Sequence, residues 1–255
     1  MGSKASYIKE IKFPDSFETY YEPFLGSGTI FCHLEPKRAV IGDTNPFIID
    51  VYKNLRKGIN VNELQSVINT RILFNARKKE FNENYVSTPY FSFLFIYLIR
   101  YSFGNMFNNT QNPKVYFSNT FNPVRNNKKI ENFPTKLENL KSLLNENNIT
   151  ILNEDYKRTL NDCKENDFVV LDPPYISADP KMYLKNSFDN KEFLEYIKVL
   201  VDKKCKILVF NYYNESFINY LLGLGFKMFE LKKTKNINKI THQTKRHIFL
   251  TNYND

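Results

Sequence analysis

A carboxylate, two prolines and an aromatic ring follow a short apolar run in the segment FVVLDPPY, residues 168–175. Pro173 and Pro174 have a fixed φ and no N–H, so they stiffen the chain directly after Asp172 and leave a backbone carbonyl without a built-in donor. A carboxylate and a carbonyl that converge on one point form a site for an NH₂ group, which has two donors. Tyr175 adds a flat face on which a heterocycle can stack.

This combination predicts activation of an amino group. An exocyclic amine is a poor nucleophile because its lone pair is delocalised into the ring. Two acceptors on its hydrogens favour a more tetrahedral nitrogen with an available lone pair. The alternative is a strand that ends in a proline turn, but the acid, both prolines and the aromatic ring occur together here.

A second group of candidate residues lies in YEPFLGSG, residues 21–28. The pattern predicts a strand, a tight turn and the start of a helix, and glycines there let the backbone approach a ligand closely. Asp43 ends the next predicted strand, where an acid can accept hydrogen bonds from ribose hydroxyls. Asp43 could instead cap the helix that starts near Pro46, or do both. The sequence contains no phosphate-binding loop of the GxxxxGK[ST] type.

Strands alternating with helices must position these residues. The pattern predicts strands at 19–22, 39–42, 150–152, 168–171 and 206–210, and a closing antiparallel pair at 226–231 and 247–251. It predicts a short helix that ends at Leu34 and further helices at 46–55, 191–202 and 215–222. This alternation is typical of an α/β, doubly wound, mostly parallel sheet, here with seven strands. Ligands bind at the carboxyl ends of such strands, where Asp43 and Asp172 are expected.

Residues 59–145 break the alternation. Stretches 64–79 and 90–100 are helical by period, and residues 105–127 are rich in Asn, Pro and Phe. We therefore expect a mainly helical subdomain at 59–145, inserted into a domain formed by 1–58 and 146–255.

Positive charge is concentrated in two stretches of this chain of 255 residues and net charge +9. Residues 71–130 carry nine basic side chains against two acidic ones, and residues 232–246 carry six and no acid. Such clusters favour a phosphate-facing surface, with a solvated lysine-rich face as the alternative.

The other polar residues exclude several classes of protein. Cys32, Cys163 and Cys205 form neither a disulfide framework nor a zinc spacing, so core thiols in a reducing, cytoplasmic compartment are expected. The three histidines have no metal-ligand spacing either, and no metal is expected. No apolar run reaches the roughly 18 residues of a membrane span, and no secretory signal is recognisable.

In these motifs the sequence resembles the Dam-type, alpha-group DNA adenine-N6 methyltransferases. DPPY at 172–175 matches their catalytic motif, and EPFLGSG at 22–28 matches their cofactor loop. Weaker similarities are GSK at 2–4 followed by Tyr7, GDTNP at 42–46 with Tyr52 downstream, NEDY at 153–156, FGNM at 103–106 and TNY at 251–253. The chain has Phe107, Asn108 and Asn109 where family members often carry an arginine, so the best-known family target, GATC, is not carried over.

The resemblance implies a Rossmann-like methyltransferase fold and transfer of a methyl group from S-adenosylmethionine to adenine N6 in double-stranded DNA, leaving S-adenosylhomocysteine. The target base would be flipped out of the helix. The residues that the resemblance assigns to catalysis are Asp172, Pro173, Pro174 and Tyr175. Those that it assigns to the cofactor are Lys4, Tyr7, Glu22, Pro23, Phe24, Gly26, Ser27, Gly28, Asp43, Asn45, Asp155, Tyr156 and Asp172.

DNA contacts are expected from both basic stretches, with phosphates at the 232–246 loop and base edges at Arg and Asn side chains of the insert. The candidates are Arg100, Asn105, Asn108, Lys114, Arg125, Lys128, Lys129, Lys232, Lys233 and Lys235. The alternative for each Asn is that it caps a turn. A restriction endonuclease is a further candidate partner, and a monomer or weak dimer is expected.

Three other activities stay open at this point. The first is N4-methylation of cytosine, whose enzymes usually have serine in place of Asp172. The second is a catalytically silent DNA-binding relative, although such a module need not retain the acid. The third is methylation of RNA.

Overall fold

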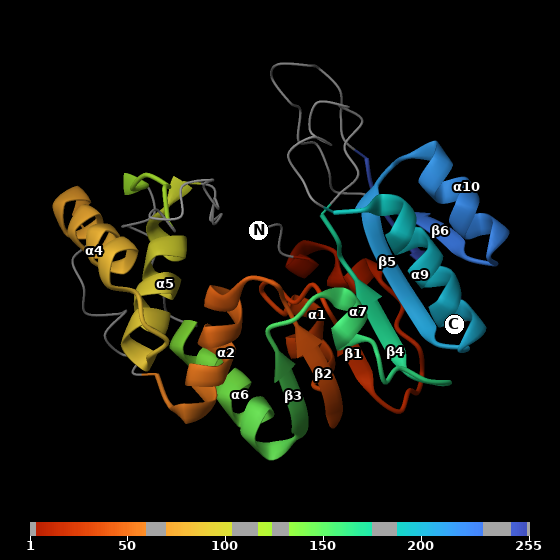
Figure 1. Ribbon diagram of the computed structural model, residues 1–255, viewed down its shortest axis with the longest axis horizontal. Helices are drawn as coiled ribbons and strands as arrows, with labels where there is room; N and C mark the ends of the chain where they lie inside the picture. Colours follow the sequence, from red (N-terminus) through yellow and green to blue (C-terminus); the bar gives the residue numbers. More distant parts are fainter. Residues whose placement is uncertain are drawn as a thin grey trace. The chain divides into compact units, whose positions relative to one another are not determined.

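The computed structural model describes residues 4–59, 70–103, 117–123, 133–174, 188–231 and 246–253 (Figure 1). The chain divides into two compact units, one with residues 45–153 and one with residues 3–44 and 154–255. The predicted insert, 59–145, falls inside the first unit. Its role in recognising DNA stays a prediction.

Seven strands form one sheet in the order β3-β2-β1-β4-β5-β7-β6. They are β1 (Tyr20–Glu22), β2 (Arg38–Gly42), β3 (Asn148–Leu152), β4 (Phe168–Leu171), β5 (Lys206–Tyr212), β6 (Lys227–Glu230) and β7 (His247–Thr251). Strand β1 pairs in parallel with β2 and β4, and β4 with β5, whereas β7 is antiparallel to β5 and β6. The predicted seven-stranded, mostly parallel sheet is confirmed.

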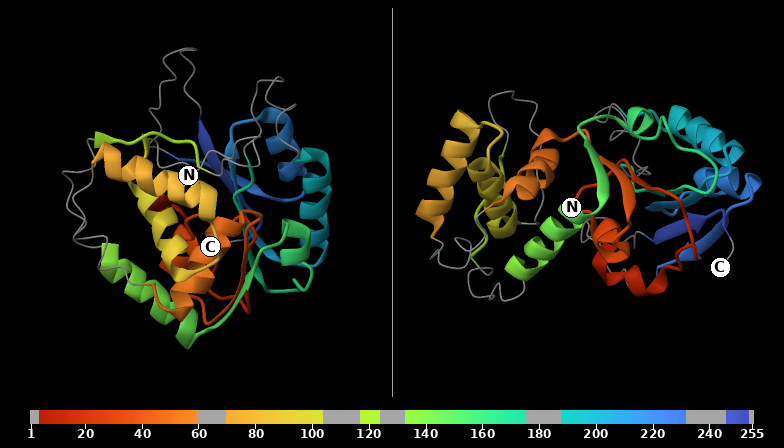
Figure 2. Two further views of the ribbon diagram at one scale, coloured as in Figure 1. Left: turned by 60° about the vertical axis from the view of Figure 1, so that its left-hand side comes forward. Right: turned by 90° about the horizontal axis from the view of Figure 1, so that it is seen from below.

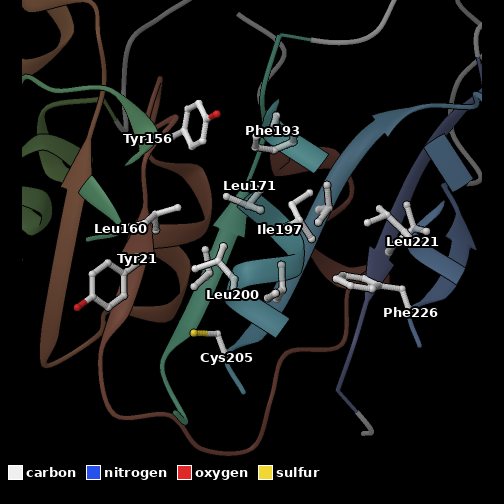
Figure 3. Packing of buried hydrophobic residues seen from close by; sticks show 14 of the residues in the cluster. Tyr21, Tyr156, Leu160, Leu171, Phe193, Ile197, Leu200, Cys205, Leu221 and Phe226 are labelled. Atoms are coloured by element: carbon white, nitrogen blue, oxygen red, sulfur yellow. The ribbon is translucent and has the colours of Figure 1, made fainter. Parts of the chain in front are cut away.

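Helices cover both faces of the six strands in the second unit (Figure 2). They are the 3-10 helices η1 (Lys4–Ser6) and η2 (Ile8–Glu10) and the α-helices α1 (Thr29–Leu34), α7 (Tyr156–Thr159), α9 (Asn190–Asp202) and α10 (Glu215–Gly223). On the α9 face, Leu171 and Val209 pack in one buried cluster with Ile197 and Leu200 (Figure 3). Complete burial of each such side chain stabilises the fold by about 1.5–3 kcal/mol.

The local sequence explains where helix α9 starts and which face it buries. Asp189 caps α9 by accepting hydrogen bonds from the backbone N–H groups of Lys191 and Glu192, and Phe193, Ile197 and Leu200 recur at helical spacing on its buried side. Cys163 and Cys205 are buried in the same cluster with their sulfurs 3.6 Å apart, as expected of core thiols.

The first unit is built on an aromatic core. Its helices within the described residues are α2 (Pro46–Lys57), α4 (Arg71–Asn84), α5 (Pro89–Tyr101) and α6 (Phe133–Glu146). The ring of Phe47 lies 5.4 Å from that of Phe81 and 4.6 Å from that of Tyr85, and Phe95 stacks on both phenylalanines. The hydroxyl of Tyr85 donates a hydrogen bond to Asp50, which ties the end of α4 to α2.

Several predicted boundaries are wrong. Helix α4 begins at Arg71, where the Thr70 hydroxyl caps it by accepting from the backbone N–H of Leu73, and it continues to Asn84, past the predicted end at Lys79. Residues 64–69 of the predicted helix lie outside the described residues. Helices α6 and α7 were not predicted. Strand β5 runs two residues past Phe210, since Asn211 and Tyr212 pair with β7.

None of the helices within the described ranges is long and apolar enough to cross a membrane.

Candidate active site

The parallel pairing of β1 and β4 brings two acidic residues to the same edge of the sheet. Glu22 is the last residue of β1 and Asp172 directly follows β4. Pro173 is buried, Pro174 is exposed, and Asp172 is partly exposed. This edge is the one at which ligands bind in open α/β sheets, as predicted from the order of the elements.

Lys4 forms an ion pair with the candidate catalytic acid, Asp172. Its Nζ is 2.6 Å from Oδ2 of Asp172 and 4.9 Å from the ring centroid of Phe210, and the lysine is 8% exposed. Removing one partner of a buried ion pair strongly destabilises a protein, because the other charge is left without compensation. The sequence assigned Lys4 to the cofactor only by resemblance, and the contact with Asp172 was not foreseen.

Glu22 is almost completely buried beside this ion pair. Its Oε2 accepts a hydrogen bond of 2.8 Å from the hydroxyl of Tyr20, and its exposed fraction is 4%. Burial raises the pKa of Glu22 to about 8, and the negative charge of Asp172 adds to the effect. Glu22 is therefore mostly protonated at neutral pH.

The glycine-containing turn after β1 is held against the end of β2. Gly26 and Gly28 have left-handed φ angles of 48° and 56°, a conformation that favours glycine. The backbone N–H of Gly26 donates to Oδ2 of Asp43 at 2.9 Å, and that of Leu25 donates to the carbonyl of Gly42 at 2.9 Å. Asp43 thus orders the loop.

The alternative in which Asp43 caps the following helix is wrong. Asn45 occupies the cap position of α2 and accepts from the backbone N–H of Phe47 at 3.0 Å. This cap also gives Asn45 a structural role that the sequence did not predict.

Asp155 and Tyr156 start the short helix α7. Asp155 caps it by accepting from the N–H of Arg158. Tyr156 packs near-parallel to Phe24, with ring centroids 5.8 Å apart, and burial raises its pKa to about 12. Its hydroxyl is buried and has no hydrogen-bond partner within the described ranges.

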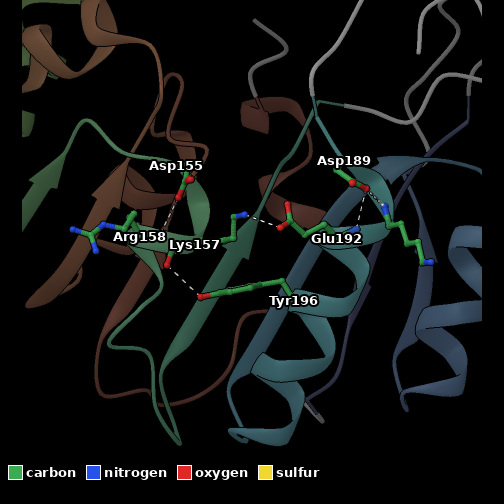
Figure 4. A network of polar contacts seen from close by, with 7 residues as sticks. Asp155, Lys157, Arg158, Asp189, Glu192 and Tyr196 are labelled. Atoms are coloured by element: carbon green, nitrogen blue, oxygen red, sulfur yellow. Dashed lines mark hydrogen bonds and ion pairs between the residues drawn. The ribbon is translucent and has the colours of Figure 1, made fainter. Parts of the chain in front are cut away.

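A polar network joins α7 to α9 (Figure 4). The Nζ of Lys157 lies 2.8 Å from Glu192, and the hydroxyl of Tyr196 donates to the carbonyl of Lys157 at 3.2 Å. These contacts fix α7, and with it Asp155 and Tyr156, relative to the helix that covers β5.

We expect that Gly42→Ala destabilises the protein by about 1–3 kcal/mol, because an added methyl overpacks a filled space. A Cβ at Gly42 would lie 2.5 Å from Oγ1 and 2.9 Å from Cγ2 of Thr159. Thermal unfolding measures the loss. Thr159→Ala should recover part of it in the double variant, and strictly additive effects of the two substitutions would contradict this contact.

The sequence missed a group of residues on β5 and β7. The ring centroid of His247 lies 4.6 Å from that of Tyr212 and 6.2 Å from that of Tyr7. Asn211 is 1% exposed, and its Nδ2 has no partner among the residues that the structure describes. Polar residues at the carboxyl end of a predicted strand were the available signal, but the strand was predicted to end at Phe210.

Other predicted site residues lie outside the described ranges. They are Tyr175, Asn105, Asn108, Lys114, Arg125, Lys128, Lys129, Lys232, Lys233 and Lys235. Arg100 is described and lies in the last turn of α5, in the unit that does not contain Asp172.

The described site offers several hydrogen-bond acceptors. Asp43, Asp155 and Asp172 provide carboxylate oxygens, the left-handed turn at Gly26 provides close backbone, and Tyr156 provides a buried polar atom without a partner. Within the described ranges no group of three or more His, Cys, Asp or Glu is placed to hold a metal ion. Such hydrogen-bond acceptors suit an organic ligand with hydroxyl and amino groups.

Comparison with known proteins points to one class of enzyme. The family model described as D12 class N6 adenine-specific DNA methyltransferase matches residues 1–240. The chain is 26% identical over 191 residues to the type II methyltransferase M1.LlaDCHI of Lactococcus lactis subsp. cremoris, which covers 69% of this chain and 63% of that protein, less than two thirds of its length.

Two further relatives are named DNA adenine methylase. The Haemophilus influenzae protein is 23% identical over 253 residues, covering 91% of this chain and 85% of the relative. The Vibrio cholerae protein is 24% identical over 206 residues, covering 73% and 69%.

Proposed function

The chain belongs to the D12 class of N6 adenine-specific DNA methyltransferases, and we propose that it transfers a methyl group from S-adenosylmethionine to adenine N6 in duplex DNA. The observation that carries the proposal is the position of Asp172. Its carboxylate follows β4 at the carboxyl edge of the sheet and contacts Lys4, and β4 pairs with β1, the strand that leads into the Gly26 turn.

The described residues fit the cofactor. Asp43 and the Gly26 turn would hold its ribose, and Asp155 with Tyr156 and Phe24 would hold its adenine. When bound, S-adenosylmethionine supplies a methyl group on a positively charged sulfur. The protein's own contribution is to order this loop, through the Gly26–Asp43 hydrogen bond, before the cofactor arrives.

Asp172 and the Pro173 carbonyl would accept hydrogen bonds from the amino group of the target adenine. These two acceptors would orient the amine and increase the availability of its lone pair. Tyr175 would stack on the base, which must leave the duplex to reach the site. In the structure the ammonium of Lys4 contacts the same carboxylate oxygen, so binding of the base would share or replace this contact.

The reaction is tested by incubation with tritiated S-adenosylmethionine and mixed-sequence duplex DNA, followed by digestion to nucleosides. We expect the label in N6-methyladenine. Label in N4-methylcytosine would contradict the choice of base, and tight DNA binding without any label would indicate a silent relative. Parallel incubation with RNA tests the other nucleic acid.

We also propose that the basic stretches contact DNA, with the lysines of residues 232–246 on phosphates. Replacing Lys232, Lys233 and Lys235 with alanine should weaken binding to all sequences alike, because phosphate contacts position a protein without reading bases. If all three contact phosphate, the slope of log K against log salt should fall by about 2.7.

A control of equal charge separates this effect from net charge alone. Lys37, Lys191 and Lys198 are exposed in the described structure, and their triple alanine variant should keep the wild-type slope. An unchanged slope in the first variant would show that the 232–246 loop does not touch DNA.

A further inference from the structure

Glu22 is more deeply buried than is usual for an ionisable side chain. It is 4% exposed, whereas Asp43 and Asp172 at the same edge of the sheet are partly exposed. It ends β1 and is followed directly by the turn that we assign to the cofactor. Its contacts are a hydrogen bond from the Tyr20 hydroxyl and a backbone hydrogen bond from Phe31.

The charges around Glu22 do not balance if it is ionised. Among the described residues, the cation that acts on Glu22 is Lys4, whose ammonium lies 2.6 Å from Asp172. Two carboxylates would then share one ammonium in a largely buried place. An ionised carboxylate that is buried without its own cation is costly, and such a group retains its proton instead.

We propose that Glu22 is a neutral carboxylic acid in this arrangement and loses its proton when positively charged S-adenosylmethionine binds, so that cofactor binding is coupled to proton release. The inference rests on the proposed function, because it requires this cofactor. The cofactor carries a sulfonium, an ammonium and a carboxylate, a net charge of plus one. In the step the O–H bond of the Glu22 carboxyl breaks, the proton passes to the buffer, and the carboxylate remains to compensate the incoming charge.

The groups around Glu22 act on its pKa in opposite directions, and the effects that raise it are the larger. Burial, and after it the charge of Asp172, raise the pKa of Glu22 to about 8, while the Tyr20 hydroxyl, the Phe31 backbone and Lys4 lower it. The Cys32 thiol on α1 is a further titratable neighbour, and burial, with the charge of Glu22, raises its pKa to about 12, so it stays neutral. A nearby cation favours the ionised form of Glu22.

The proposed proton release makes the affinity for S-adenosylmethionine depend on pH. At pH 7 the free protein holds roughly 0.9 proton on Glu22 and at pH 9 roughly 0.1, and binding releases most of what is held. Because binding releases a proton, affinity for S-adenosylmethionine should rise with pH by at most about tenfold per pH unit, below the range of about 7.7–8.0 in which the cofactor's own α-amino group titrates.

Calorimetry counts the released protons directly. Binding of S-adenosylmethionine is measured at pH 7 in buffers of different ionisation enthalpy, and the dependence of the observed heat on that enthalpy gives the number released. We expect about 0.9 proton for the wild type at pH 7 and close to zero for Glu22→Gln at the same pH. Glu35→Gln, which removes an exposed carboxyl at the end of α1, should leave the wild-type count.

Infrared difference spectra provide a second readout that does not depend on heats. Addition of S-adenosylmethionine should remove the carbonyl band of a protonated carboxylic acid in the wild type and in Glu35→Gln. No such loss should occur in Glu22→Gln, which lacks this carboxyl group. A proton count near zero in the wild type, or an equal count in Glu22→Gln, would overturn the inference.

Equilibrium dialysis with labelled S-adenosylmethionine separates this result from the proposed function. Binding without proton release refutes the coupling and leaves the proposed function intact. Absence of binding in the wild type refutes both.

Discussion

Asp172→Ala is expected to reduce methyl transfer to adenine by at least about 10²–10³-fold, the cost of removing one preorganised electrostatic group from an active site. The carboxylate is proposed to accept a hydrogen bond from the reacting amine. Binding of S-adenosylmethionine should stay within roughly tenfold of the wild type, about 1.4 kcal/mol. Single-turnover transfer of tritium to duplex DNA measures the first effect and equilibrium dialysis the second.

The ion pair with Lys4 complicates this variant, since removing Asp172 takes away the carboxylate that this buried ammonium contacts. Loss of one partner of a fully buried pair costs about 3–5 kcal/mol of stability, and the cost should be smaller here because the side chain of Asp172 is 26% exposed. The double variant Lys4→Met/Asp172→Ala removes both charges, so it should be more stable than Asp172→Ala and still fail to transfer methyl groups. Asp202→Ala, at the exposed end of α9, is the matched control. Transfer within a few-fold of the wild type in the double variant would reject the catalytic role of Asp172.

Asp43→Ala is expected to weaken binding of S-adenosylmethionine about 10²–10³-fold. Hydrogen bonds to a charged group contribute about 1.5–3 kcal/mol each, and the variant loses the proposed contacts with the ribose. It also removes the acceptor for the N–H of Gly26, so the loop loses one of its fixed points. Equilibrium dialysis with labelled cofactor gives the dissociation constant.

Asp43→Asn separates the two contributions. An asparagine keeps an oxygen that can accept from the Gly26 N–H, but it lacks the negative charge, so we expect an intermediate affinity. Asn45→Ala provides the contrast, because Asn45 caps α2. Its loss should cost about 1 kcal/mol of stability. If Asp43→Ala binds the cofactor as tightly as the wild type, Asp43 has no role beyond ordering the turn.

Much of this architecture follows from the sequence because local patterns are enough to define it. Apolar runs of four or five residues that end in an acid marked β2 and β4, and the helical spacing of Phe193, Ile197 and Leu200 marked α9. Alternation of strand and helix then requires a parallel sheet, and a parallel sheet places the residues after β2 and β4 at one edge. The predicted positions of Asp43 and Asp172 needed no further information.

The short or context-dependent elements could not be predicted in this way. Helix α7 has four residues, fewer than any periodic pattern needs, and it depends on the Asp155 cap and the contacts of Lys157 and Tyr196 with neighbouring elements. The last two residues of β5 are a strand only because β7 pairs with them. In each case partners distant in the sequence decide the local structure.

The sequence by itself determined which chemical groups the protein carries and at which edge of the sheet they lie, because local patterns show where strands end and how strands alternate with helices. Only the tertiary structure decided their electrostatic state. Lys4 is 168 positions away from Asp172 in the chain, yet their charged atoms are 2.6 Å apart, and Glu22 looks like any acidic residue until burial raises its pKa to about 8. A pKa depends on desolvation and on charges within a few ångströms, and neither exists until distant segments of the chain pack together.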